Sequence, residues 1–96
     1  ALHWGEGQLR LYADTIVFEG KLAPGPDYRL YLTPKFVETE ADFLSVKQQS
    51  VEIGAVRNFD GFVLSNSPAI DDAQYTTAVV WCETFGQFIT SGQYRP

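Results

Sequence analysis

The chain has 96 residues, of which 45% are hydrophobic and 15% aromatic, and it carries a formal net charge of −5 at pH 7. This composition excludes a disordered chain and predicts one folded domain. Its seven Lys and Arg residues form no cluster of the kind that binds phosphate backbones or anionic membranes, so we expect no nucleic-acid partner. No apolar run approaches the ~20 residues of a membrane-spanning helix, so no membrane span is expected either. Because the chain begins with Ala1 and contains no Met, we expect a fragment or a processed product.

Alternation of apolar and polar residues predicts three strands in the first third of the chain. Residues 7–13 and 15–22 are separated by a gap short enough for a tight hairpin. The sequence APGPD at 23–27 predicts a turn, because Pro fixes φ and Gly permits positive φ. Residues 28–34 then form a third strand. Its alternation places Tyr28, Leu30 and Leu32 on one face and Arg29, Tyr31 and Thr33 on the other.

The middle of the chain has a weaker pattern. We interpret 35–46 as a long connection, with a short helical turn or an irregular edge strand as the alternatives. Alternation returns at 49–58, and a turn at Asp60-Gly61 leads into a short strand that ends at residue 65.

Residues 66–77 are rich in turn-forming residues and are expected to cross between strands, with one helical turn at 71–75. Residues 78–94 predict a final strand or hairpin that is broken near Gly86. Helical periodicity over ten or more residues does not occur. The expected fold is therefore all-β, a compact antiparallel β-sandwich or barrel of about seven to ten short strands, in a single domain over residues 1–96.

Most catalytic and metal-binding patterns are absent from the sequence. His3 is the only histidine, and no serine lies in a G-x-S-x-G motif, so hydrolytic catalysis has little support. One His and one Cys cannot form a structural zinc site. Asp71 and Asp72, with Asp27 or Asp60, offer oxygen ligands for calcium, but a D-x-D-x-D-G loop is lacking and we favour solvated turn carboxylates. We expect no metal site, and the sequence does not identify a cofactor.

Cys82 is the only cysteine, and it lies in the run TAVVWCETFGQF at residues 77–88. Free cysteine is among the most buried residue types and often packs as a small hydrophobic residue. Alternation places Cys82 and Val80 on one face of the strand, and Trp81 and Glu83 on the other. Composition alone favours a core residue over a redox centre.

Three blocks of the sequence resemble a known family: GEGQLRLYADTIVFEGKLAPGPDYRLYLTP (5–34), VEIGAVRNFDGFVLSNSP (51–68) and DAQYTTAVVWCETFGQFITSGQY (72–94). In their order and spacing the chain resembles the DM-thirteen domain, an electron-transfer module first noted in the Skeletor protein and also found beside DOMON domains. The Val-Trp-Cys-Glu run is the most specific part of the resemblance.

The resemblance implies a β-sandwich or barrel in an extracytoplasmic protein that is secreted, periplasmic or membrane-anchored. It also implies a redox role for the family's characteristic cysteine, here Cys82. A lone thiol cannot cycle as a dithiol, so it needs a mixed disulfide, a sulfenic acid, or an external cofactor or redox partner protein. We expect Trp81, Glu83, Phe85 and Phe88 to form the rim or the core around it.

An alternative from another class is a non-catalytic extracellular module that binds a protein or a glycan. Cys82 is then a core residue, and exposed aromatic residues such as Tyr12, Tyr31 or Tyr94 face the partner. A third, weaker hypothesis is a small-ligand pocket in the mouth of a barrel. Accessibility of the thiol separates the first hypothesis from the second.

Overall fold

Seven strands, one short α-helix and one 3₁₀ turn make up the fold in the computed structural model, which describes residues 6–12, 15–65 and 74–94. In chain order they are β1 (Glu6–Leu11), β2 (Thr15–Lys21), β3 (Tyr28–Thr33), α1 (Glu40–Val46), the 3₁₀ turn (Lys47–Gln49), β4 (Val51–Val56), β5 (Gly61–Ser65), β6 (Thr77–Cys82) and β7 (Gln87–Gln93). The all-β prediction is confirmed, with the strand number at the lower end of the expected range. The crossing expected at 66–77 falls largely outside the described residues, and so does most of the helical turn expected at 71–75.

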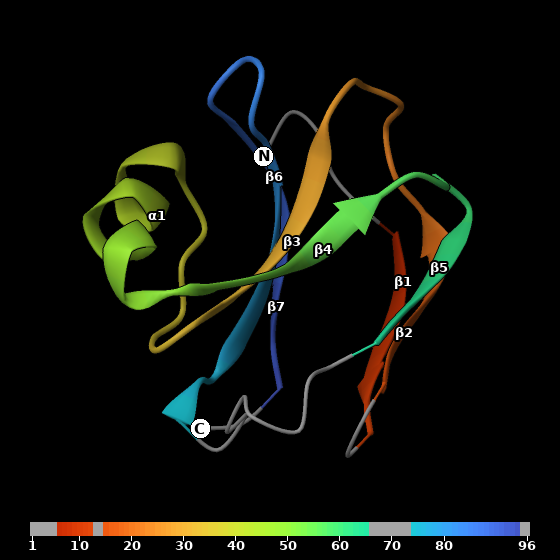
Figure 1. Cartoon of the computed structure of the whole chain (residues 1–96), viewed down its shortest axis with the longest axis horizontal. Helices are drawn as coiled ribbons and strands as arrows, with labels where there is room; N and C mark the ends of the chain where they lie inside the picture. The colour runs from red at the N-terminus through yellow and green to blue at the C-terminus, as the bar shows by residue number, and fades with distance from the viewer. Residues whose placement is uncertain (1–5, 13–14, 66–73, 95–96) are drawn as a thin grey trace.

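The strands form two antiparallel sheets, one with the order β1-β2-β5 and the other with the order β4-β3-β6-β7 (Figure 1). β1 and β2 pair as the expected hairpin. β6 and β7 also form a hairpin, and Gly86 has a φ of 60° in its turn, a conformation that glycine adopts without steric cost. The predicted break near Gly86 is therefore confirmed.

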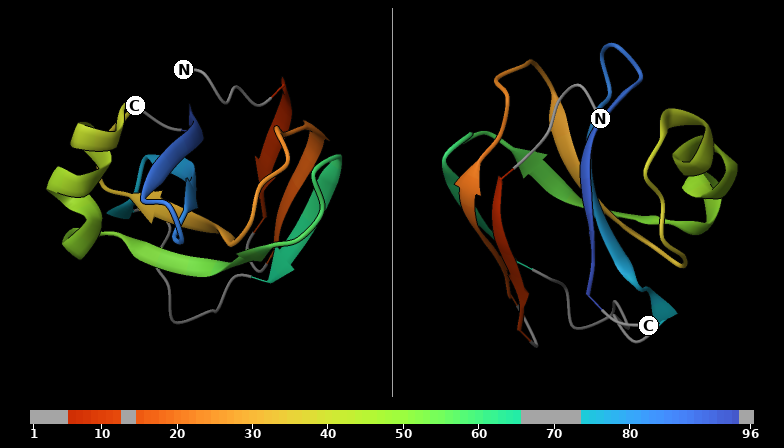
Figure 2. Two further views of the ribbon diagram at one scale, coloured as in Figure 1. Left: turned by 90° about the horizontal axis from the view of Figure 1, so that it is seen from above. Right: turned by 180° about the vertical axis from the view of Figure 1, so that it is seen from behind.

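The main core lies between the two sheets (Figure 2). Tyr28, Leu30 and Leu32 of β3 point into it, as the alternation of that strand predicts. Around them pack Ile16, Phe18, Leu22, Val56, Phe62, Ala78, Val80, Cys82 and Ile89. We call the side of the four-stranded sheet that faces this core its inner face.

The outer face of the four-stranded sheet is covered by α1, so the molecule has three layers: helix, sheet and sheet (Figure 2). Thr39 begins the helix, because its side chain accepts a hydrogen bond from the Asp42 amide at 3.1 Å. Phe43 and Val46 are the buried residues of the helix. The interpretation of 35–46 as a long connection was wrong, because this segment contains a capped two-turn helix, which is closer to the alternative of a short helical turn.

A second core cluster lies between α1 and the outer face. Its members are Tyr31, Val37, Phe43, Val46, Val79, Trp81 and Phe88. The Phe43 ring lies 4.6 Å from the Trp81 ring and 5.1 Å from the Tyr31 ring, measured between ring centroids. Because both faces of the sheet are covered, every residue of β6 is buried.

Candidate functional site

Cys82 ends β6 on the inner face, where its side chain is 1% exposed. Its cross-strand neighbour on β3 is Tyr28, so the thiol and the phenol ring lie side by side in the main core. The thiol donates a hydrogen bond to the backbone carbonyl of Pro26, with an Sγ to O distance of 3.0 Å. A surface loop therefore provides the polar contact of the buried sulfur.

We call residues 23–27, the sequence APGPD, the cover loop. Three further hydrogen bonds attach it to the site: the Tyr28 hydroxyl donates to the Ala23 carbonyl at 2.5 Å, the Glu83 amide to the Asp27 carbonyl at 3.0 Å, and the Thr84 hydroxyl to Asp27 Oδ2 at 3.1 Å. Together with the thiol contact they hold the loop at both of its ends. The cover loop is therefore fixed next to Cys82 by four hydrogen bonds.

The cover loop has a backbone conformation that depends on its sequence. A Cβ atom on Gly25 would lie 2.6 Å from the Tyr28 hydroxyl oxygen, so the loop packs on the phenol ring more closely than another residue permits. Asp27 has a φ of 56°, in the left-handed region that Asn and Asp tolerate better than most residues. Burial raises the pKa of Tyr28, and the neighbouring Cys82 adds to the rise, so the phenol stays a protonated donor to the loop.

The aromatic residues expected around Cys82 lie elsewhere. Trp81 and Phe88 belong to the second core cluster, on the other side of the sheet from the sulfur. Phe85 is 70% exposed in the turn between β6 and β7. Cys82 belongs instead to the main core, where Tyr28 is its cross-strand neighbour.

Glu83 joins a polar cluster on the outer face. It accepts a hydrogen bond from the Tyr31 hydroxyl, and its Oε1 lies 3.1 Å from Lys47 Nζ. The same ammonium lies 5.8 Å from the Tyr31 ring centroid and 5.7 Å from that of Trp81. The Tyr31 hydrogen bond and the Lys47 charge lower the pKa of Glu83, although burial opposes them. Burial and the Glu83 carboxylate raise the pKa of Tyr31 strongly.

Arg29 connects this cluster to the cover loop. Its guanidinium lies 3.1 Å from Asp27 Oδ1 and 3.3 Å from Glu52 Oε1. Asp27, one of the carboxylates considered for calcium, is therefore engaged by Arg29 and Thr84. Asp71, Asp72 and His3 lie outside the described residues.

The three tyrosines that the binding-module hypothesis expects to be exposed differ in their exposure. Tyr12 is exposed, as expected for a partner-facing residue. Tyr31 is 6% exposed, so its assignment as a partner-facing residue was wrong. It lies on the outer face of the four-stranded sheet, which α1 covers. Tyr94 is partly buried and packs against the main core.

The sequence singled out Cys82 but not Pro26 or Tyr28, and it suggested Asp27 only as a possible calcium ligand. In the structure, these three residues contact Cys82 or hold its cover loop. The APGPD sequence predicts a turn correctly but does not show which strand end the turn covers. That information depends on the pairing of β3 with β6, which brings together residues more than fifty positions apart.

Fold and site together define a two-sheet antiparallel domain with one buried thiol beneath a Pro-Gly-Pro loop. The sequence model of the family described as "Electron transfer DM13" matches residues 1–94, so this chain belongs to the DM13 electron-transfer family. No curated protein and no solved structure matches the chain. Within the described residues, no helix has the length and apolar character needed to cross a membrane.

Proposed function

We propose that Cys82 is the redox group of this electron-transfer domain and that it acts with a partner protein. The observation that carries the proposal is the position of the sulfur, 3.0 Å from the Pro26 carbonyl and directly beneath the cover loop. A buried thiol under a sheet would require global unfolding to react. A thiol under a five-residue surface loop requires a local opening, which costs less free energy.

The chain has one cysteine, so the second sulfur of the redox couple comes from the partner. The Cys82 sulfur attacks a disulfide of the partner, a new S–S bond forms between Cys82 and one partner sulfur, and the partner's own S–S bond breaks. The other partner sulfur leaves as a thiolate and takes up the proton that Cys82 has lost. Cys82 is oxidised to the mixed disulfide, while one sulfur of the partner is reduced to a thiol.

The test is reaction of the folded domain with a small aromatic disulfide that releases a coloured thiolate. We expect one thiolate released per chain, a mixed disulfide at residue 82 by mass spectrometry, and neither product with Cys82→Ser. Gly25→Ala should react faster than the wild type, because the added Cβ would meet the Tyr28 hydroxyl at 2.6 Å and loosen the cover loop.

Gly92→Ala is the matched control, because a Cβ at Gly92 meets no atom within 4 Å. It should react at the wild-type rate. Equal rates for Gly25→Ala and Gly92→Ala would contradict the role of the cover loop. A folded wild type that forms no mixed disulfide would contradict the redox role itself.

A second candidate function is a non-catalytic protein- or glycan-binding domain in which Cys82 only packs. The 1% exposure of Cys82 and its place in the main core favour this alternative. Phe85 and Val63, both well exposed, then offer apolar contact area. Absence of the mixed disulfide in the experiment above would select this function.

We also propose an extracytoplasmic location. It rests on the resemblance to DM-thirteen domains and on the chemistry above, since stable disulfides in a partner are typical of oxidising compartments. Fusion of alkaline phosphatase, an enzyme that needs disulfides, to the full-length protein tests it. Phosphatase activity in intact cells is expected, and an inactive fusion that is present in the cytoplasm would contradict the location.

A further inference from the structure

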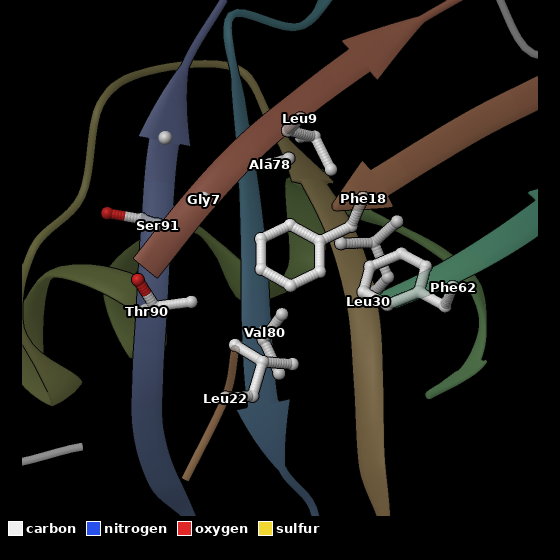
Figure 3. Close-up of a pocket in the computed structure, with 11 residues that line it drawn as sticks. Gly7, Leu9, Phe18, Leu22, Leu30, Phe62, Ala78, Val80, Thr90 and Ser91 are labelled. Atoms are coloured by element: carbon white, nitrogen blue, oxygen red, sulfur yellow. The ribbon is translucent and has the colours of Figure 1, made fainter. Parts of the chain in front are cut away.

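A hollow of about 140 Å³ opens into the main core between the two sheets (Figure 3). It lies between the edge strand β1 of one sheet and the edge strand β7 of the other. Its wall is formed mainly by the apolar side chains Phe18, Leu22, Leu30, Phe62, Ala78 and Val80. Thr90 and Gly92 of β7 complete it on one side.

Small residues on facing positions leave this space. Ala78 of β6 and Gly92 of β7 are cross-strand partners, so both belong to the inner face of the sheet. A Cβ built on Gly92 meets no atom within 4 Å, so it would stand in free space. Ser91, the residue before Gly92, points away from the hollow and donates its hydroxyl to the Val37 carbonyl (Figure 3).

The side chains that line the hollow indicate which class of ligand it could bind. The Phe18 and Phe62 rings stack with centroids 5.3 Å apart and form an aromatic side to the hollow. Thr90 pairs with Val80 and so shares the inner face, and its hydroxyl has no hydrogen-bond partner among the described residues. The site therefore combines an apolar interior with one polar group at its side.

We propose that this hollow binds a single six-membered ring that carries one hydroxyl group, such as a small phenol. The volume is comparable to the roughly 150 Å³ of an apolar cavity that accepts benzene. The ring lies against Phe18 and Phe62, and its hydroxyl exchanges a hydrogen bond with Thr90. The proposal is independent of the redox role of Cys82, whose thiol is held by the cover loop.

Titration of the ¹⁵N-labelled domain with p-cresol, followed by amide chemical shifts, tests the proposal. Saturable shifts are expected in β1, β2, β6 and β7. Gly92→Leu should abolish them, because its side chain fills the hollow from a position without steric conflict. Gly54→Ala, a control on β4 where the added Cβ meets Leu64 at an ordinary 3.6 Å, should bind as the wild type does.

Thr90→Val tests the polar contact separately. It should weaken binding of p-cresol roughly threefold to tenfold, as expected for one hydrogen bond, while binding of toluene stays unchanged. A two-ring phenol such as 2-naphthol should not bind, because the hollow admits one ring. Failure of p-cresol to give saturable shifts, or equal binding by Gly92→Leu, would overturn the proposal and leave the hollow as a packing defect.

Discussion

Tyr31 and Glu83, two residues on the outer face, should make the unfolding free energy depend on pH. Tyr31 donates to the Glu83 carboxylate, and Lys47 lies within ion-pair distance of the same group. These contacts require a charged carboxylate, so they lower the pKa of Glu83 below its usual value of 4.5. Protonation of Glu83 should therefore weaken the attachment of β6 to the 3₁₀ turn.

The pH dependence of stability checks this assignment. Because folded Glu83 has a lower pKa than unfolded Glu83, the unfolded state binds more protons near that pKa and stability rises with pH. The contribution is present above about pH 4.5 and is lost as the pH falls through the folded pKa. Glu83→Gln should reduce the slope of unfolding free energy between about pH 3 and pH 6, measured by urea denaturation. Glu19→Gln, which also removes one carboxylate but at an exposed position on β2, is the control for the change in net charge.

At alkaline pH, we expect Tyr31 to make the unfolding free energy depend on pH. Its pKa is raised by burial and by Glu83, so its contribution to stability is complete below the unfolded pKa of 10.0 and is lost as the pH rises through the folded pKa. Tyr31→Phe should remove part of the alkaline loss of stability. Tyr28, whose pKa is also raised, should account for part of what remains. An unchanged alkaline profile in Tyr31→Phe would contradict the burial of this phenol.

Among the elements, α1 is the one that the sequence pattern did not predict. A helix of seven residues with only Phe43 and Val46 buried has too few apolar positions for a detectable helical period. The strands were predicted because alternation over six or seven residues is visible in the sequence. Burial of both faces of β6 was not predictable, because it depends on α1 lying over Trp81 and Val79.

The contribution of α1 can be measured by substitutions within it. Phe43→Ala removes a fully buried ring from the second core cluster and should cost about 3–5 kcal/mol of unfolding free energy. Leu44→Ala, at the neighbouring position where the side chain is 57% exposed, should change it by no more than about 0.5 kcal/mol. Similar losses for both variants would mean that α1 does not pack on the sheet by the Phe43 side.

The cap of the same helix gives a smaller expected effect. Thr39→Ala removes the acceptor for the Asp42 amide and should cost about 1 kcal/mol. Thr39→Asn, which retains a capping oxygen, should restore most of the loss. Equal stability of the wild type and Thr39→Ala in urea denaturation would contradict the capping role.

For the whole molecule, local patterns predicted the fold class but not the tertiary arrangement of the site. Alternation in β3 correctly placed Tyr28, Leu30 and Leu32 together in the main core. The sheet order β4-β3-β6-β7 depends on long-range pairings that no local pattern contains. The contact of Cys82 with Pro26 follows from that order, so the sequence could identify the thiol without showing what covers it.

In the redox function that we propose, Cys82 becomes reactive when the cover loop opens. The most direct measurement is the rate of Cys82 alkylation as a function of urea at concentrations where the protein remains folded. We expect labelling to correspond to an opening free energy that is below that of global unfolding and nearly independent of urea, since a loop exposes little surface. Labelling with the full free energy and urea dependence of global unfolding would mean that the cover loop does not open on its own and that Cys82 is a core residue alone.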